Sequence, residues 1–375
     1  MGMPASNVPD DPTTVMRSIL KRIATGPELS KDISYKEART GMQYVLDGKV
    51  DPVQAAIFLI ALRMKRETDD ENRGVLQAIR DATSTVTANV DEVLDLADPY
   101  DGYNRTLPVS PFLPAVLAAC GVACVTHGVE RMGPKFGVTH RQVLRAAGLA
   151  VDQTVEEAAA RLADPTIGWA YVDQNAFCPK LHRLSDFRTL LVKRPAITTS
   201  EVVAGPIRGR RSTHLVTGYV HKPYPRIYAL LARHAGFDSA LIVRGVEGGV
   251  LPSLRQRGKA FYYHERGEVH AIDFTPADFA IEQSLRAAPL PPGLAGQSDE
   301  DVDVAFDSEA IATAAATEGR EALAGKPGPV RNSLVSAAAL YLWHLGRYDG
   351  LRSAADAVRA VLDNGVVHER LVHIT

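Results

Sequence analysis

The sequence is poor in cysteine and has no excess of charge. Its 375 residues include three cysteines, and its 42 basic side chains nearly balance 44 acidic ones. An odd number of cysteines without metal-ligand spacing argues against a disulfide scaffold or a zinc site. The net charge of −2 excludes a global polycation and leaves only a local basic face open. The first residues show no secretion signal, so we expect a cytoplasmic protein.

The sequence also lacks an uninterrupted hydrophobic run and an internal repeat. Residues 107–125 are nearly all apolar and approach the length of a membrane span. However, Pro108, Pro111 and Pro114 interrupt the first half, and Gly121 separates a helix-like half from a strand-like half. This pattern predicts a buried helix followed by a buried strand.

What is present is typical of a globular protein, with 46% hydrophobic and 23% charged residues. Residues 1–13 are rich in Pro and Asp, and we expect them to be disordered. Helix-start signals follow at Ser34, at Asp51-Pro52 and at Thr68, which predict three helices within residues 34–88. The sequence therefore predicts a small helical lobe over residues 14–90.

From about residue 95 to residue 375, short β-segments alternate with helical patterns. The predicted strands are 123–126, 169–172, 215–220, 240–243, 260–263 and 269–273. The predicted helices are 112–120, 140–147, 154–162, 226–234, 308–323, 332–344 and 351–363. Residues 287–303, rich in Pro, Gly and acidic residues, are predicted to be a loop or linker. This order predicts an α/β lobe with a mostly parallel central sheet.

The segment 122–137 carries the strongest local signal for a ligand. A β-branched run ends in His127-Gly128, and a loop with Lys135 and Gly137 follows before the next helix. Such a loop offers backbone N–H groups and cations at the carboxyl end of a strand, which favours a phosphate site. His127 either donates to that phosphate or is a satisfied histidine at the end of a strand.

Four segments in order resemble the anthranilate phosphoribosyltransferase family, also called glycosyltransferase family three. Residues 51–68 are similar to its second helix and the Lys-Gly-Glu-Thr turn after it. Residues 101–121 lie where the family has its glycine-rich diphosphate loop and the next helix. Residues 126–137 resemble its Lys-His-Gly-Asn-Arg loop and downstream Lys-x-Gly, and residues 332–341 resemble its C-terminal Asn-Ala-Ala-Ala-Ala-Leu-Tyr helix.

The resemblance implies a helical lobe on an α/β lobe, with a phosphoribosyl diphosphate site between them. It also implies Mg²⁺ if the protein is active, and commonly a homodimer formed through the helical lobe. The residues that it places at the phosphate and acceptor sites are Asp101, Gly102, Ser110, His127, Gly128, Lys135 and Arg188, with Lys193 and Arg194 on the same segment as Arg188.

The chain departs from the family at the two features that phosphoribosyl transfer requires, the diphosphate loop and the metal ligands. The glycine-rich loop is replaced by residues 98–105, of which only Asp101-Gly102 matches. Pro99 removes a backbone donor and Tyr100 adds bulk. The family's paired Asp-Glu metal ligands are replaced by Val250, Leu251 and Pro252, so only Glu247 offers a carboxylate nearby.

These departures resemble a divergent, YbiB-type branch of the family that is associated with nucleic-acid binding. The similar segments are Thr126-His127-Gly128-Val129, Asn175-Ala176-Phe177-Cys178-Pro179, His221-Lys222-Pro223 and Gly245-Val246-Glu247-Gly248. Arg208, Arg210 and Arg211, together with Arg188, Lys193, Arg194, Arg226 and Arg244, either line one basic groove or are separate solvated cations. Tyr100 and Tyr103 either stack on bases or, as we favour, pack locally.

Two hypotheses follow. The first is a non-catalytic member whose cleft binds a phosphate-rich ligand such as single-stranded nucleic acid. The second is a working phosphoribosyltransferase that uses phosphoribosyl diphosphate and anthranilate or a related aromatic acceptor.

Overall fold

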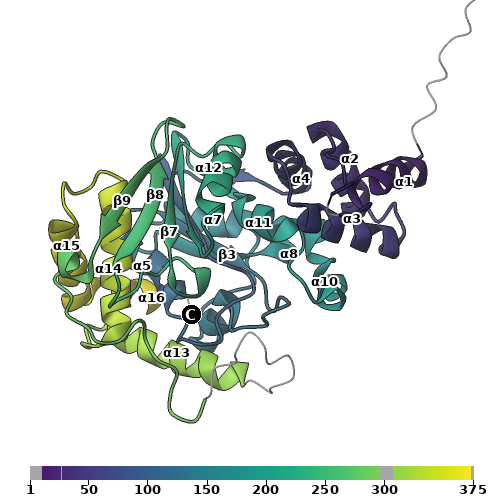
Figure 1. The fold of residues 1–375 in the computed structure, drawn as a ribbon. Helices are drawn as coiled ribbons and strands as arrows, with labels where there is room; N and C mark the ends of the chain where they lie inside the picture. The colour runs from purple at the N-terminus through teal and green to yellow at the C-terminus, as the bar shows by residue number, and fades with distance from the viewer. Residues whose placement is uncertain (1–10, 27, 295–306, 373–375) are drawn as a thin grey trace, which may run out of the picture.

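The computed structural model describes residues 11–26, 28–294 and 307–372, which form a helical lobe beside a larger α/β lobe (Figure 1). Two sequence-based predictions fall partly outside this range, namely the disordered start at residues 1–10 and the end of the linker at residues 295–303. Among the described residues, no helix is long and apolar enough to cross a membrane, as the interrupted hydrophobic run predicts.

The helical lobe begins with α1 (Pro12–Ile23), α2 (Tyr35–Leu46), α3 (Pro52–Lys65) and α4 (Asp69–Asp81). Ser34 and Thr68 form capping boxes at the starts of α2 and α4, and Asp51 caps α3. Each cap satisfies backbone N–H groups that have no partner within the helix, which is worth about 1 kcal/mol. Helix α1 was not predicted, and it begins two residues inside the segment expected to be disordered.

A later part of the chain returns to this lobe. It contains α8 (Gln174–Phe177), α9 (Pro179–His182), α10 (Ser185–Leu191), α11 (Ile197–Ser200) and η2 (Glu201–Val203). Phe177 and Ile197 are buried in the same hydrophobic cluster as Phe58 and Ile79 of the first helices. Residues 174–203 therefore pack against the first helices (Figure 1), and the domain boundary expected near residue 95 stays a prediction.

The α/β lobe is built on a sheet with the strand order β4-β3-β2-β6-β7-β8-β9. The first five strands run parallel, and β8 pairs antiparallel with both β7 and β9. The strands are β2 (Glu92–Ala97), β3 (Cys124–Gly128), β4 (Trp169–Asp173), β6 (Ser212–Tyr219), β7 (Ser239–Arg244), β8 (Gly258–Tyr263) and β9 (His270–Phe274). A separate pair joins β1 (Val86–Thr87) to β5 (Ile207–Arg208). Six strands match the predicted ones, whereas β2 and the short strands β1 and β5 were not predicted.

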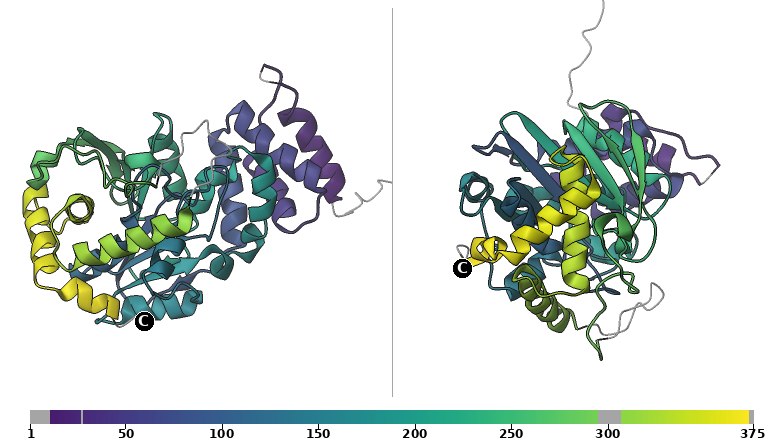
Figure 2. Two further views of the ribbon diagram at one scale, coloured as in Figure 1. Left: turned by 90° about the horizontal axis from the view of Figure 1, so that it is seen from below. Right: turned by 90° about the vertical axis from the view of Figure 1, so that its left-hand side faces the viewer.

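Helices cover both faces of this sheet (Figure 2). One face packs on η1 (Ser110–Phe112), α5 (Leu113–Ala119), α6 (His140–Ala146), η4 (Pro276–Phe279), α13 (Ser308–Leu323), α14 (Pro329–His344), α15 (Leu351–Asp363) and α16 (Val366–Val372). The other face packs on α7 (Val155–Ala163) and α12 (Tyr224–His234), while η3 (Val246–Gly248) follows β7. The mostly parallel α/β architecture predicted from the sequence is confirmed.

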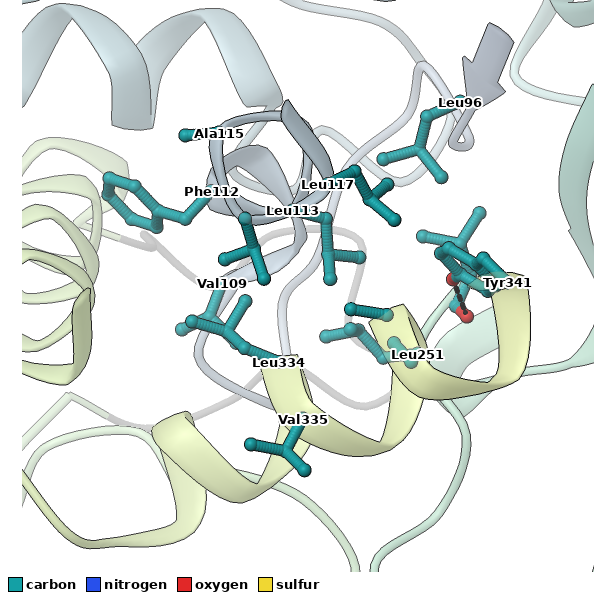
Figure 3. Packing of buried hydrophobic residues seen from close by; sticks show 14 of the residues in the cluster. Leu96, Val109, Phe112, Leu113, Ala115, Leu117, Leu251, Leu334, Val335 and Tyr341 are labelled. Atoms are coloured by element: carbon teal, nitrogen blue, oxygen red, sulfur yellow. Dashed lines mark hydrogen bonds between the residues drawn. The ribbon is translucent and has the colours of Figure 1, made fainter. Parts of the chain in front are cut away.

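The core between α5 and α14 reaches the edge of the sheet where ligands bind in such folds. Leu113 and Leu117 of α5 and Leu334 of α14 belong to one buried hydrophobic cluster (Figure 3). Leu251 is part of the same cluster and is 6% exposed. The Tyr341 hydroxyl donates to the carbonyl of Val250 at 2.6 Å, which fixes the chain next to Leu251.

Candidate functional site

A cavity of about 550 Å³ opens at the carboxyl ends of the parallel strands. The loops that follow β2, β3, β6 and β7 form most of its wall, and Arg63 and Arg188 reach it from the helical lobe. Open α/β sheets bind ligands at this edge because the loops of neighbouring strands converge there. The cavity therefore lies between the lobes, where the resemblance implies a site.

Cations outnumber acids in the cavity wall, with eight cationic and three acidic side chains. Each acid forms an ion pair at 2.6 Å with one of the cations, in the pairs Asp101–Arg194, Glu201–Arg188 and Glu247–Lys135. Arg244 and Arg286 are exposed and form no ion pair with any other described residue. The remaining positive charge makes this wall attractive to an anion.

A row of aromatic rings lines the cavity beside these cations. The ring centroids of His221 and Tyr224 are 6.3 Å apart, and those of Tyr224 and Tyr228 are 6.1 Å apart. Arg63 donates to the Tyr224 hydroxyl at 2.8 Å, which holds the middle ring in place. Tyr219, at the end of β6, also faces the cavity. Rings of this kind offer flat surfaces on which bases can stack.

The loop after β2 is closed around the buried side chain of Asp98. This carboxylate accepts hydrogen bonds from the hydroxyls of Tyr103 (2.7 Å) and Ser110 (2.6 Å) and from the N–H of Val250 (3.0 Å), and it lies 2.7 Å from Nε2 of His140. Burial raises the pKa of Asp98, but the hydrogen bond and charge of His140, with the two hydroxyls, outweigh it and keep this pKa below its usual value. Ser110 is fully buried in this cluster and does not line the cavity.

Other donors of the same loop hold Glu247. The N–H groups of Asn104 and Arg105 donate to its carboxylate at 3.2 and 3.0 Å, the Thr106 hydroxyl donates at 2.8 Å, and the Lys135 ammonium lies at 2.6 Å. Burial of Glu247 raises its pKa, but Lys135 and the other donors outweigh this and lower the pKa. We call these four donors the anion nest. In this structure its anion is a side chain of the protein itself.

His127 is a satisfied histidine, the second of its two predicted alternatives. It is 1% exposed, its Nδ1 lies 2.5 Å from the Tyr100 hydroxyl, and its Nε2 lies 2.9 Å from a carboxylate oxygen of Asp95. Tyr100 and Tyr103 are also buried, as the packing alternative for them expects. Tyr100 separates His127 from the cavity, because Tyr100 lines the wall and His127 does not.

The two glycines of the predicted site have structural roles. Gly102 has φ 71°, and a Cβ at this position would lie 2.5 Å from the carbonyl oxygen of Val138. The neighbouring Tyr103 exchanges two backbone hydrogen bonds with Val138, at 3.0 and 2.7 Å. The backbone N–H of Tyr103 is therefore already bonded within the protein. Gly128 is the buried last residue of β3.

Several predicted cations do not reach the cavity. Lys193 is exposed outside its wall, and Arg226 pairs with Asp69 on the surface. Arg210 and Arg211 pair with Asp91 at the amino ends of β2 and β6, which is the opposite edge of the sheet.

Arg208 is also directed away from the cavity. Its guanidinium lies 4.2 Å from the centroid of the Phe237 ring, and burial, followed by repulsion from Arg80, lowers its pKa to about 10. Of the two alternatives for these arginines, one basic groove therefore does not form from all of them. The structure brings together Arg188, Arg194 and Arg244.

The residues that would have to hold Mg²⁺ do not fit that role. Val250 and Leu251 are buried among hydrophobic side chains where the family has its acidic pair, and Figure 3 shows Leu251 in this cluster. The nearby carboxylate of Glu247 is committed to the anion nest, and the described part of the chain contains no group of three His, Cys, Asp or Glu side chains that could hold a metal ion. Mg²⁺ prefers carboxylate oxygens, and the described residues at this position do not offer the set of carboxylates that it needs.

The sequence alone did not single out several residues of the wall. Arg63 lies in the segment 51–68 that resembles the family's second helix, but nothing marked it as a ligand residue, and no motif marked Glu201. Asp95 and Asp98, which are buried behind the wall, were not singled out as site residues either. Only the His221-Lys222-Pro223 segment before α12 marked the region of the aromatic row.

Comparisons with known proteins agree with this architecture. Residues 17–83 match the helical bundle domain of a glycosyl transferase family, and residues 101–367 match the a/b domain of a glycosyl transferase family. An uncharacterized protein of Aquifex aeolicus (strain VF5) is 29% identical over 65% of this chain and 75% of its own.

Two further similarities cover almost the whole chain. An anthranilate phosphoribosyltransferase of Rhodopseudomonas palustris (strain BisA53) is 26% identical over 96% of both chains. The structure of anthranilate phosphoribosyltransferase from Saccharomyces cerevisiae in complex with PRPP and Mg has a TM-score of 0.71 over 96% of both chains. At 15% identity, that structure supports the fold alone.

Proposed function

The chain belongs to this glycosyl transferase family, and we propose that its cleft binds a phosphate-rich ligand, single-stranded nucleic acid, instead of transferring a phosphoribosyl group to anthranilate. The proposal rests on one observation: two carboxylates of the protein itself accept the hydrogen bonds that a bound diphosphate would accept. Asp98 and Glu247 occupy the donors of the loops where the family binds a diphosphate. A diphosphate that used these donors would have to displace both carboxylates.

The rest of the cleft supports a ligand with several phosphates and with bases. Arg244 and Arg286 supply exposed charge, and the row formed by His221, Tyr224 and Tyr228 supplies stacking surfaces. Phosphate contacts give most of the affinity for nucleic acid, and aromatic stacking adds about 1–3 kcal/mol per base.

The proposal places the chain in the YbiB-type branch and includes a homodimer. On α3, Val53, Ile57 and Met64 are 66%, 40% and 74% exposed and recur at helical spacing. An apolar stripe of this kind is a surface that a second copy could cover.

Fluorescence anisotropy with a labelled single-stranded oligonucleotide tests the proposal. We expect affinity to fall at least about tenfold between about 50 and 200 mM salt, because binding releases counterions from the phosphates. Arg244→Glu is expected to weaken binding about tenfold. Arg210→Glu makes the same charge change at the far edge of the sheet and serves as the matched control. Salt-independent binding, or equal effects of the two variants, would contradict the proposal.

The alternative is a working phosphoribosyltransferase, which is favoured by the 26% identity to a named anthranilate phosphoribosyltransferase over 96% of the chain. Calorimetric titration with phosphoribosyl diphosphate, with and without Mg²⁺, separates the two functions. Tight binding that depends on Mg²⁺ supports the enzyme, and no heat at high ligand concentration supports the binding protein.

A further inference from the structure

Glu247 occupies an unusual position in the backbone as well as in the site. It lies in η3, directly after β7, and has φ 54° and ψ 18°, which is the left-handed region that a residue with a side chain rarely adopts. Its neighbours Gly245 and Gly249 leave no room for a Cβ, since one at Gly245 would lie 1.6 Å from the carbonyl oxygen of Gly249. The turn is therefore tightly packed, and it directs the Glu247 carboxylate into the anion nest.

The nest has the donors of a phosphate site. It combines two consecutive backbone N–H groups, one hydroxyl and one ammonium, all within 3.2 Å of the carboxylate oxygens. Successive N–H groups form a concave anion-binding surface, and a lysine adds charge to the phosphate oxygens. A carboxylate uses only two oxygens here, whereas a phosphate offers three or four to the same donors.

The nest also faces the ligand cavity. Arg105, Thr106, Lys135 and Glu247 all belong to the cavity wall. The side chains of Lys135 and Glu247 are only 6% and 5% exposed, so their pairing is shielded from bulk water. A phosphate that enters the cavity therefore meets this pair as part of the wall and can reach the donors only by replacing the carboxylate.

We propose that the anion nest is a phosphate subsite and that Glu247 is its built-in competitor, which a phosphate group of the ligand must displace. This inference rests on the proposed function, because it describes how that ligand would be admitted. The apparent affinity for phosphate in the native protein is then the intrinsic affinity multiplied by the small fraction of molecules in which Glu247 has left the nest. Removal of the carboxylate is expected to restore the intrinsic affinity.

The test measures binding of inorganic phosphate by calorimetry and its effect on thermal unfolding. Glu247→Ala is expected to bind phosphate at least about tenfold more tightly than the native chain and to be stabilised by phosphate. Asp69→Ala removes the same charge from a surface pair outside the cavity and should behave like the native chain. A folded Glu247→Ala that binds phosphate no better than Asp69→Ala overturns the proposal.

A second variant keeps the test decisive if Glu247→Ala does not fold. Glu247→Gln keeps the shape and the acceptor oxygen but loses the ion pair with Lys135, so phosphate should displace it more easily than the native glutamate. Equal phosphate affinity of Glu247→Gln and the native chain overturns the proposal. If the proposed function fails and this inference holds, the result differs. The native protein and both variants would then show the phosphate affinities expected above, but none of them would bind single-stranded DNA.

Discussion

The Tyr103→Phe substitution tests the cluster around Asp98 most directly. The Tyr103 hydroxyl donates to both oxygens of the Asp98 carboxylate, at 2.9 and 2.7 Å, and the Tyr103 side chain is 2% exposed. Phenylalanine keeps the ring and its packing and removes only the donor. Because a hydrogen bond to a charged group contributes about 1.5–3 kcal/mol, we expect the free energy of unfolding to fall by about that amount.

Urea unfolding, monitored by tryptophan fluorescence, measures this loss of stability in the α/β lobe, which contains the Asp98 cluster. The chain has two tryptophans, Trp169 in β4 and Trp343 in α14, and both belong to the α/β lobe. Tyr262→Phe is the matched control, because the Tyr262 hydroxyl forms no hydrogen bond with any described residue and its ring is half-buried. We expect this control to remain within about 0.5 kcal/mol of the native chain.

The pH dependence of the stability difference between Tyr103→Phe and the native chain tests the role of Asp98 a second time. The pKa of Asp98 is lowered in the folded state, so the stability that its carboxylate contributes is present above the unfolded value of about 3.9 and is lost as the pH falls through the folded value. The difference between Tyr103→Phe and the native chain should therefore be full at neutral pH and shrink below about pH 4. A variant as stable as the native chain at neutral pH would refute the reasoning.

Three further predictions concern other buried groups. Burial, followed by neighbouring imidazoles, lowers the pKa of His344 well below 6.5, so stability should fall below about pH 6.5 by up to about 1.4 kcal/mol per pH unit, and His344→Gln should flatten this slope in urea midpoints. Arg188→Met leaves Glu201 buried without its partner and should cost about 3–5 kcal/mol in urea unfolding, whereas replacing both residues by Met should recover most of this loss. Leu251→Asp, which restores a carboxylate where the family binds its metal, should cost about 4 kcal/mol or more, whereas Leu285→Asp at a site that is 40% exposed should be nearly neutral in soluble yield and unfolding.

The pattern of hydrophobic residues predicted most of the α/β lobe. Helices α13 and α15 were predicted with the bounds that the structure has, because Asp307 and Gly350 precede them and Gly325 and Gly365 follow them closely. Strand β2 was missed because Asp95 interrupts its short apolar run. That aspartate is fully buried and bonded to His127, a tertiary contact that no local pattern reveals.

Helix α1 and the site illustrate two different limits. The Asp11-Pro12 start of α1 carries the same signal that identified α3, and the Pro-rich composition of the preceding residues concealed it. For the site, sequence resemblance located the loops and the missing acidic pair. It could not show that the Glu247 carboxylate accepts hydrogen bonds from residues 104–106, which lie 141–143 residues earlier in the chain. A single sequence does not reveal which distant residues are in contact.

The position of β2 in the middle of the sheet has a consequence for synthesis. β2 pairs with β3, which follows it closely, and with β6, which is 120 residues further along the chain. Until the ribosome has released β6, one edge of β2, the middle of the five parallel strands, has no partner in the growing chain. An unpaired parallel edge is prone to aggregate, and parallel pairing over such a distance forms slowly. Nascent chains that end between residues 128 and 212 should therefore depend most strongly on chaperones, and ribosome-stalled chains of graded length would reveal this interval.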